Sequence, residues 1–186
     1  MSIADQSMLL ADTGPFCRFA EAGDDAIDAL VSYLGDSIRI TQDVSIELQR
    51  LAKTQFPRLN RFIWKKFPVE DPITITDKRL LDQIENIVQG RRRHNPGHFM
   101  EDRGEVATIL IAKALGCPVL IDDRWGKERF AIKKGVLTFS TEDLAVEMAV
   151  AGALSEDDAF EVFRRVYNSP RLTFDTRLAA IRQPQS

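Results

Sequence analysis

The sequence predicts an α/β fold in which helices cover a parallel sheet. Short apolar runs alternate with helical stretches along the chain, a pattern typical of strands joined by crossover helices. Two of these runs, residues 8–11 and 117–121, are each followed by aspartate, and buried parallel strands have the sequence of such brief apolar runs. We therefore expect a doubly wound sheet whose strands bring carboxylates to one edge.

The length and composition indicate one ordinary globular domain. The 186 residues are 44% hydrophobic and 28% charged. No apolar stretch approaches the roughly 20 residues that span a bilayer, and the first residues lack the basic flank of a secretory signal. We therefore expect a cytoplasmic protein with no membrane partner. The net charge of −3 disfavours a protein that coats nucleic acid, and two cysteines are too few for a disulfide framework.

Five short runs are the strand candidates. Each is rich in apolar or β-branched residues and is bounded by polar residues, glycine or proline. The third is the weakest candidate, because it is short and Pro72 precedes it. The predicted strands are residues 7–11, 37–41, 73–76, 117–121 and 136–139.

Helices are predicted between and after these runs. Gly90 and Gly116 are expected to end two of them, and Ser140 and Ser155 begin sequences typical of helix caps. Asp102 is a candidate cap for a helix that Glu105 opens. Residues 1–168 should form the domain and residues 169–186 a peripheral tail bounded by prolines. The predicted helices are residues 16–22, 26–34, 44–53, 78–89, 106–115, a helix after Asp123 that ends near Gly135, and residues 144–151 and 159–166.

Acidic residues stand at the boundaries of the predicted elements. Asp12 follows the first strand, Glu47 lies in the helix after the second, Glu105 opens the helix before the fourth, and Asp123 follows the fourth together with Asp122. Because like charges are costly together unless a cation joins them, we expect a divalent-metal site. Hard cations such as Mg²⁺ and Mn²⁺ prefer oxygen ligands, and they make coordinated water acidic enough to attack a phosphodiester.

Each acid also has an ordinary structural interpretation. Asp12 and Asp123 can be helix N-caps, Glu105 can favour the positive end of a helix, and Glu47 can be a solvated helix residue. Taken singly, the structural interpretation is favoured. The joint occurrence of these acids at element ends is what favours a metal site.

Basic residues gather in two places around this acidic centre. Such an arrangement is compatible with a site that holds a metal ion and attracts a phosphate chain, and solvated faces are the alternative. We expect Arg124, Lys127 or residues 91–94 to neutralise phosphate. The two groups are residues 91–94, and Arg124, Lys127, Arg129, Lys133 and Lys134.

The segments around these acids resemble the PIN-domain superfamily, in the branch related to VapC-type toxins of prokaryotic toxin–antitoxin systems. The resemblance is carried by residues 9–15, 44–48, 102–109 and 119–124, and it extends over about residues 8–166. It implies a three-layer α/β/α fold with a five-stranded parallel sheet in the order 3-2-1-4-5. The helix at residues 155–166 and the tail exceed a minimal toxin.

The resemblance also implies a metal-dependent ribonuclease that cleaves single-stranded RNA with Mg²⁺ or Mn²⁺. Asp12, Glu47, Glu105 and Asp123 match the acidic quartet of the family, and Asp122 either replaces or assists Asp123. Thr13 matches the hydroxyl residue that follows the first aspartate and is a candidate substrate contact, as are Arg124 and Lys127. An antitoxin protein and a second copy of the chain are candidate partners.

Other enzyme classes lack their motifs in this chain. No glycine-rich phosphate loop and no Gly-x-Ser-x-Gly nucleophile motif occurs, and His94 and His98 do not have zinc-protease spacing. The main alternative is a non-catalytic module of the same fold that binds RNA or a protein.

Overall fold

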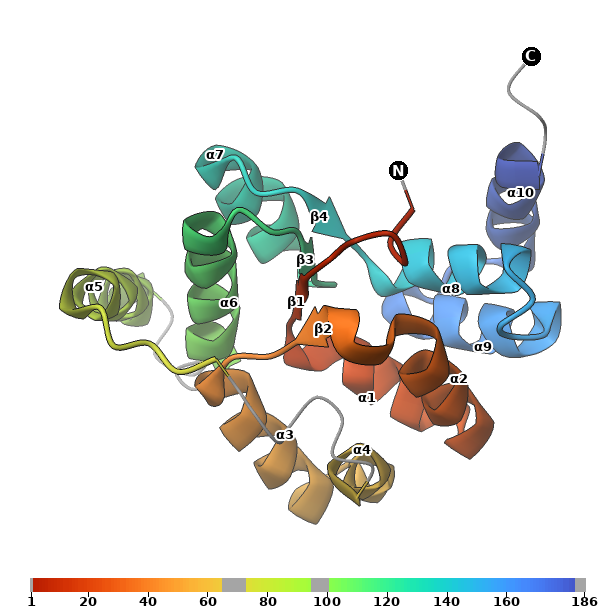
Figure 1. The fold of residues 1–186 in the computed structure, drawn as a ribbon, viewed down its shortest axis with the longest axis horizontal. Helices are drawn as coiled ribbons and strands as arrows, with labels where there is room; N and C mark the ends of the chain where they lie inside the picture. The colour runs from red at the N-terminus through yellow and green to blue at the C-terminus, as the bar shows by residue number, and fades with distance from the viewer. Residues whose placement is uncertain (1, 65–72, 95–100, 183–186) are drawn as a thin grey trace.

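A four-stranded parallel sheet in the order β2-β1-β3-β4 lies at the centre of the computed structural model, which describes residues 2–64, 73–94 and 101–182 (Figure 1). β1 pairs with β2 on one side and with β3 on the other, where Leu10 pairs with Val119 and Ala11 with Leu120. β2 therefore lies on one side of β1, and β3 and β4 lie on the other side. The strand order switches between β1 and β3. The strands are β1 (Leu9–Ala11), β2 (Ile38–Arg39), β3 (Val119–Leu120) and β4 (Thr138–Phe139).

Four of the five predicted strands are confirmed, and each is shorter than its apolar run. The prediction of a fifth strand at residues 73–76 is wrong for the described residues, because this segment makes a single parallel bridge from Ile73 to Thr41, just beyond β2. Two hydrogen bonds form the bridge, from Ile73 N to Ile40 O at 2.9 Å and from Gln42 N to Ile73 O at 3.2 Å. The run is too short for a ladder, because α5 begins at Lys78.

Helices cover both faces of the sheet and give the three layers α/β/α. The helical elements are α1 (Thr13–Ala22), α2 (Asp24–Leu34), η1 (Gly35–Ser37), α3 (Gln42–Thr54), η2 (Pro57–Leu59), α4 (Asn60–Trp64), α5 (Lys78–His94), α6 (Glu101–Leu115), the π-helical η3 (Trp125–Ala131), α7 (Ile132–Lys134), α8 (Thr141–Val150), α9 (Glu156–Tyr167) and α10 (Arg171–Arg182). No helix in the described ranges has both the length and the apolar content that crossing a membrane requires.

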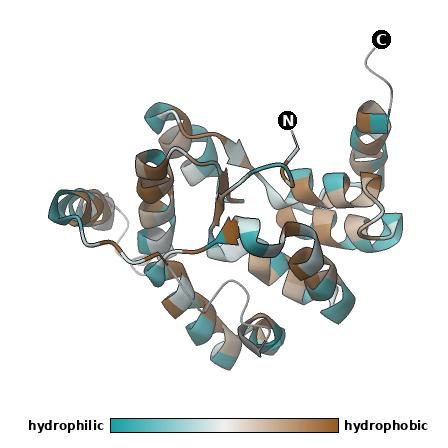
Figure 2. Cartoon of the chain, in the orientation of Figure 1, coloured by the Kyte–Doolittle hydropathy of each residue, from teal (hydrophilic) through white to brown (hydrophobic). Residues whose placement is uncertain are grey.

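The alternation of side chains along β1 divides the core in two. Leu9 and Ala11 join the larger cluster, with residues of α1, α2, α3, α8, α9 and α10. Leu10 joins the smaller cluster, with residues of α5 and α6. Figure 2 shows the hydrophobic residues gathered on the strands and on α6 beside them. This pleat decides which layer each residue at a strand end faces.

Two helix starts match the predicted caps. The side chain of Ser140 accepts a hydrogen bond from Asp143 N while Asp143 bonds back to Ser140 N, which is a full capping box at the start of α8. Ser155 caps α9 through its side chain, which accepts a hydrogen bond from Asp158 N. These caps fix where the chain enters the helices that follow the sheet.

Two helix boundaries differ from the prediction. α5 continues through Gly90 to His94, because Ile84 and Val88 anchor its buried face and one glycine costs a helix only about 1 kcal/mol. α6 begins at Glu101, so that Asp102 lies inside the helix and Glu105 lies in its second turn rather than at its start. Residues 91–94, which the prediction placed after the end of this helix, belong to α5, and residues 95–100 lie outside the described part of the chain.

The segment after Asn168 differs from the expected peripheral tail. It forms α10, which packs on α8 and α9 (Figure 1). Phe174 and Leu178 are buried in the larger core, and the Phe174 ring meets that of Phe163 edge-on with centroids 5.3 Å apart. The helical spacing of Phe174 and Leu178 gives α10 its buried face.

Candidate functional site

Asp12 lies where the strand order switches. It directly follows β1, and its backbone N–H donates to the carbonyl of Leu120 in β3 at 3.0 Å. It occupies the N-cap position of α1, but its side chain makes no capping hydrogen bond. The carboxylate therefore lies at the carboxyl edge of the sheet but does not cap the helix, as an aspartate at this position ordinarily does.

Glu47 reaches the same place from α3. Its Oε2 accepts a 2.7 Å hydrogen bond from the hydroxyl of the buried Thr13, the residue after Asp12. A Cβ atom on Gly104 of α6 would lie 3.3 Å from Glu47 Oε2 and 3.9 Å from Asp12 Oδ1. Both carboxylates thus approach one point over Gly104, where an added side chain would crowd Glu47 and contact Asp12.

The electrostatics of this pair are unfavourable. Burial raises the pKa of Asp12 to about 7, and repulsion from Glu47, Asp122 and Asp123 acts in the same direction. The backbone N–H of Thr13 opposes the rise by hydrogen bonding to the Asp12 carboxylate. In the protein without a bound cation, Asp12 therefore holds its proton to near-neutral pH.

Asp122 is anchored to α8. Its two carboxylate oxygens accept hydrogen bonds from the backbone N–H of Thr141 at 2.8 Å and from the Thr141 hydroxyl at 2.9 Å. The hydroxyl of Tyr167 donates to its backbone carbonyl. Asp122 lies two residues beyond Leu120, and the pleat directs it to the layer of the larger core. Burial raises its pKa, and the donors of Thr141 act against that rise.

Asp123 is exposed and caps the next helix. Its Oδ1 accepts a 2.9 Å hydrogen bond from the backbone N–H of Gly126, and its carbonyl accepts from Lys127 N. This is the N-cap interpretation that the sequence left open. Its repulsion of the Asp12 carboxylate is nevertheless one of the causes that raise the pKa of Asp12.

Glu105 is buried beside the start of η3. A Cβ atom on Gly126 would lie 2.9 Å from Glu105 Cδ and 2.8 Å from Ile121 Cδ1, so any other residue there would force these side chains to shift. Glu105 directly follows Gly104 in α6, and Gly104 is the residue that Asp12 and Glu47 approach. The glutamate is thus held by close packing against the segment that follows β3.

The basic residues predicted to contact phosphate point toward α8 and α9. The guanidinium of Arg124 stacks on the Tyr167 ring at 4.9 Å, and Lys127 Nζ pairs with Asp143 at 3.6 Å. The side chains of residues 91–94 and of Arg129 lie outside the described part of the structure. The contacts that these two side chains make are thus with Tyr167 and Asp143 rather than with the Asp12–Glu47 pair.

Sequence reasoning missed the two glycines that shape the site. Gly104 and Gly126 are each in close contact with a predicted acid, and no local sequence signal marks them, because the contacting side chains are distant in the sequence. Neither Thr141 nor Tyr167 carries a sequence signal for its hydrogen bonds to Asp122.

The donor set suits a small hard cation. Asp12 and Glu47 offer oxygen ligands only, and Mg²⁺ needs one or two carboxylates with water completing its shell. Within the described residues, no group of three or more His, Cys, Asp or Glu side chains is arranged to hold a metal ion. Comparisons with family models, with characterised proteins and with solved structures find no match to this chain.

Proposed function

We propose that the protein is a metal-dependent ribonuclease that hydrolyses single-stranded RNA. The observation that carries the proposal is the approach of Asp12 and Glu47 to one point over Gly104, at the switch in strand order of a parallel sheet. The raised pKa of Asp12 supports a cation at this point, because a divalent ion would offset the repulsion between the acids.

Each residue has a separate task in this proposal. Asp12 and Glu47 would hold Mg²⁺ or Mn²⁺, and Thr13 would hold Glu47 in position through its 2.7 Å hydrogen bond. A bound divalent cation supplies the Lewis acidity that activates water and phosphate. Asp123, exposed at the same edge, would orient water or bind a second ion, and Glu105 would support it from α6.

Asp123 is a better candidate than Asp122 for this role. Both oxygens of the Asp122 carboxylate already accept hydrogen bonds from Thr141, and the residue is only 8% exposed. Asp123 is exposed, and its side chain accepts the hydrogen bond from Gly126 through Oδ1. Arg124 and Lys127 follow it and would attract the phosphate chain toward the acidic centre.

The resemblance to VapC-type toxins supports a narrower role as the toxin of a toxin–antitoxin pair. An antitoxin protein would then be the partner, the cytoplasm its location, and a homodimer a natural assembly. Expression of the wild-type chain should arrest growth of a bacterial host, and expression of Asp12→Asn should not. Equal growth in the two cultures would remove the toxin role and leave the ribonuclease chemistry to be tested separately.

Cleavage with and without metal tests the chemistry. Purified protein should cut a labelled single-stranded RNA in MgCl₂ or MnCl₂, lose activity with EDTA, and regain it when the cation is added back in excess. A DNA strand and an RNA duplex serve as comparison substrates. Undiminished cleavage in EDTA, after repurification to remove contaminating nuclease, would contradict the proposal.

The second candidate is a module that binds RNA without cutting it. It is favoured by the structural tasks of two of the five acids, since Asp122 anchors α8 and Asp123 caps η3. The two candidates differ in one measurement: a binding module would retain RNA in MgCl₂ without shortening it, whereas the ribonuclease would release fragments.

A further inference from the structure

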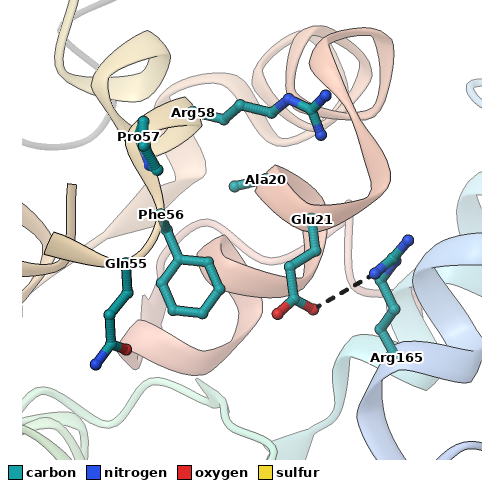
Figure 3. A pocket seen from close by; sticks show the side chains of 7 residues that line it. All are labelled: Ala20, Glu21, Gln55, Phe56, Pro57, Arg58 and Arg165. Atoms are coloured by element: carbon teal, nitrogen blue, oxygen red, sulfur yellow. Dashed lines mark ion pairs between the residues drawn. The ribbon is translucent and has the colours of Figure 1, made fainter.

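A pocket of about 510 Å³ opens between α1, the turn after α3 and α9 (Figure 3). It is lined by Ala20 and Glu21, by residues 55–58 and by Arg165. Figure 3 shows the Phe56 ring between the side chains of Gln55 and Glu21. The volume falls in the range of roughly 300–1,000 Å³ that is typical of sites for small organic groups.

The two arginines of this pocket are weakly engaged. Arg58 Nε lies 3.9 Å from Asp24, and Arg165 lies 3.9 Å from Glu21 and 3.7 Å from Glu161. Charge-assisted hydrogen bonds are usually about 2.7–2.9 Å long.

Other arginines of the chain reach that range. Arg61 bonds Asp28 at 2.5 and 2.9 Å, and Arg164 bonds Glu161 at 2.6 and 2.8 Å. By contrast, Arg165 Nε is buried and has no hydrogen-bond partner in the described part of the chain. The pocket arginines can therefore accept an anion without first breaking a strong ion pair.

The remaining groups suit a planar, hydrogen-bonding ligand. Phe56 is half-buried and offers an aromatic surface on which a base can stack. Gln55 supplies an amide and Glu21 a carboxylate, which can bond to the edge of a base or to a ribose 2′-hydroxyl. An aromatic ring, two polar side chains and two loosely held guanidiniums together fit a base joined to a phosphate.

The pocket is connected to the acid pair through the same two helices. Thr13 of α1 touches Glu47 of α3, and the pocket residues Glu21 and Gln55 each follow eight positions later. Eight helical residues span about 12 Å. A few nucleotides of single-stranded RNA can cover this distance.

We propose that this pocket binds one nucleotide of the RNA, with its base on Phe56 and its phosphate between Arg58 and Arg165. This inference rests on the proposed ribonuclease function and names a contact remote from the bond that is cut. The pocket would fix the position of the strand and thereby select where cleavage falls.

RNA binding without cleavage tests the inference. The full-length Asp12→Asn chain in EDTA is titrated into a fluorescein-labelled RNA hexamer, and anisotropy gives the Kd. Phe56→Leu should raise Kd roughly fivefold or more through lost stacking. Arg58→Ala should raise Kd and lower the salt slope by about one, as expected for a lost phosphate contact.

Matched variants outside the pocket provide the controls. Phe160→Leu changes another half-buried aromatic residue, and Arg182→Ala removes another exposed arginine, so both should leave Kd within about twofold. Arg58 is exposed and its substitution should leave the fold intact, so the test stands even if Phe56→Leu unfolds. Unchanged Kd in Arg58→Ala, or an equal loss in the controls, would overturn the inference.

Competition separates a nucleotide from a bare anion. Adenosine monophosphate should displace the hexamer at concentrations at least tenfold lower than adenosine or inorganic phosphate alone. Equal displacement by inorganic phosphate would overturn the role of Phe56. These experiments measure RNA binding and not cleavage. Loss of binding in the pocket variants would therefore support the pocket even if the wild-type chain cut no RNA. Active cleavage together with an unchanged Kd would refute the pocket alone.

Discussion

Asp12 and Glu47, which are 35 positions apart in the sequence, approach the same side of Gly104 through Oδ1 and Oε2. The sheet brings Asp12 to this point, α3 brings Glu47, and α6 leaves room for both by presenting a glycine. Burial and repulsion make the pair costly in the absence of a cation.

Asp12→Asn should stabilise the metal-free protein at alkaline pH. The pKa of Asp12 is raised from 3.8 to about 7, so the folded state holds a proton that the unfolded chain releases near pH 4. The wild-type protein therefore loses stability as pH rises from about 4 through 7, and the variant does not.

Urea denaturation in EDTA at pH 5 and pH 8 measures this difference. The advantage of the variant should grow with pH and reach at most about 4 kcal/mol. Asp36→Asn, a change at an exposed acid in the turn after α2, should show no such trend. A pH-independent difference between wild type and Asp12→Asn would contradict the assignment.

Gly104→Ala should separate stability from function. Alanine favours a helix by about 1 kcal/mol over glycine, but its methyl would lie 3.3 Å from Glu47 Oε2. We expect thermal stability to change little and RNA cleavage to fall at least tenfold.

Gly90→Ala is the matched control, because Gly90 lies in α5 with nothing within 4 Å of its added Cβ. It should stabilise the protein by up to about 1 kcal/mol and leave cleavage unchanged. Full cleavage by Gly104→Ala would show that the space over this glycine serves no catalytic purpose.

Thr13→Val should weaken the site by releasing Glu47. The variant keeps the shape of the side chain but loses the 2.7 Å hydrogen bond, so both cation affinity and cleavage should fall. Thr13→Ser retains the hydroxyl and should recover most of the activity. Calorimetric titration with MnCl₂ and a cleavage assay measure the two effects, and equal behaviour of the Val and Ser variants would argue against the role of this hydrogen bond.

Asp122→Ala should damage the fold more than Asp123→Ala. Asp122 receives two hydrogen bonds from Thr141 at the start of α8, and its loss should cost roughly 2–4 kcal/mol by leaving buried donors unpaired. Loss of the Asp123 cap should cost about 1 kcal/mol. Denaturant midpoints compare the two variants, and an equal loss would contradict the anchoring role of Asp122.

Local patterns predicted the sheet better than they predicted the site. The apolar runs before Asp12 and Asp122 were sufficient to locate β1 and β3, because buried parallel strands need little more than a short apolar segment. The segment at Ile73 has the same kind of sequence but makes only one bridge, since pairing depends on how many residues remain before α5. The position of a strand can thus be predicted from local sequence, whereas the number of strands in the sheet cannot.

The separate roles of the acidic residues could not be predicted from the sequence, because these roles depend on tertiary contacts. Both Asp122 and Asp123 follow β3, and only the pleat and the position of Thr141 show that the first is an anchor. The roles of Gly104 and Gly126 follow from the approach of distant side chains, which no local pattern encodes. The burial of Phe174 was obscured by Pro170, which suggested a tail where α10 returns to the core.

The rate of RNA cleavage by Asp12→Asn at saturating MgCl₂ tests the central claim most directly. Single-turnover rates for the wild-type protein, Asp12→Asn and the control Asp36→Asn are compared on one labelled single-stranded RNA. We predict a loss of roughly 100-fold or more in Asp12→Asn, equivalent to about 2.7 kcal/mol in the barrier, and no loss in the control. A folded Asp12→Asn protein that cleaves RNA at the wild-type rate would contradict the account.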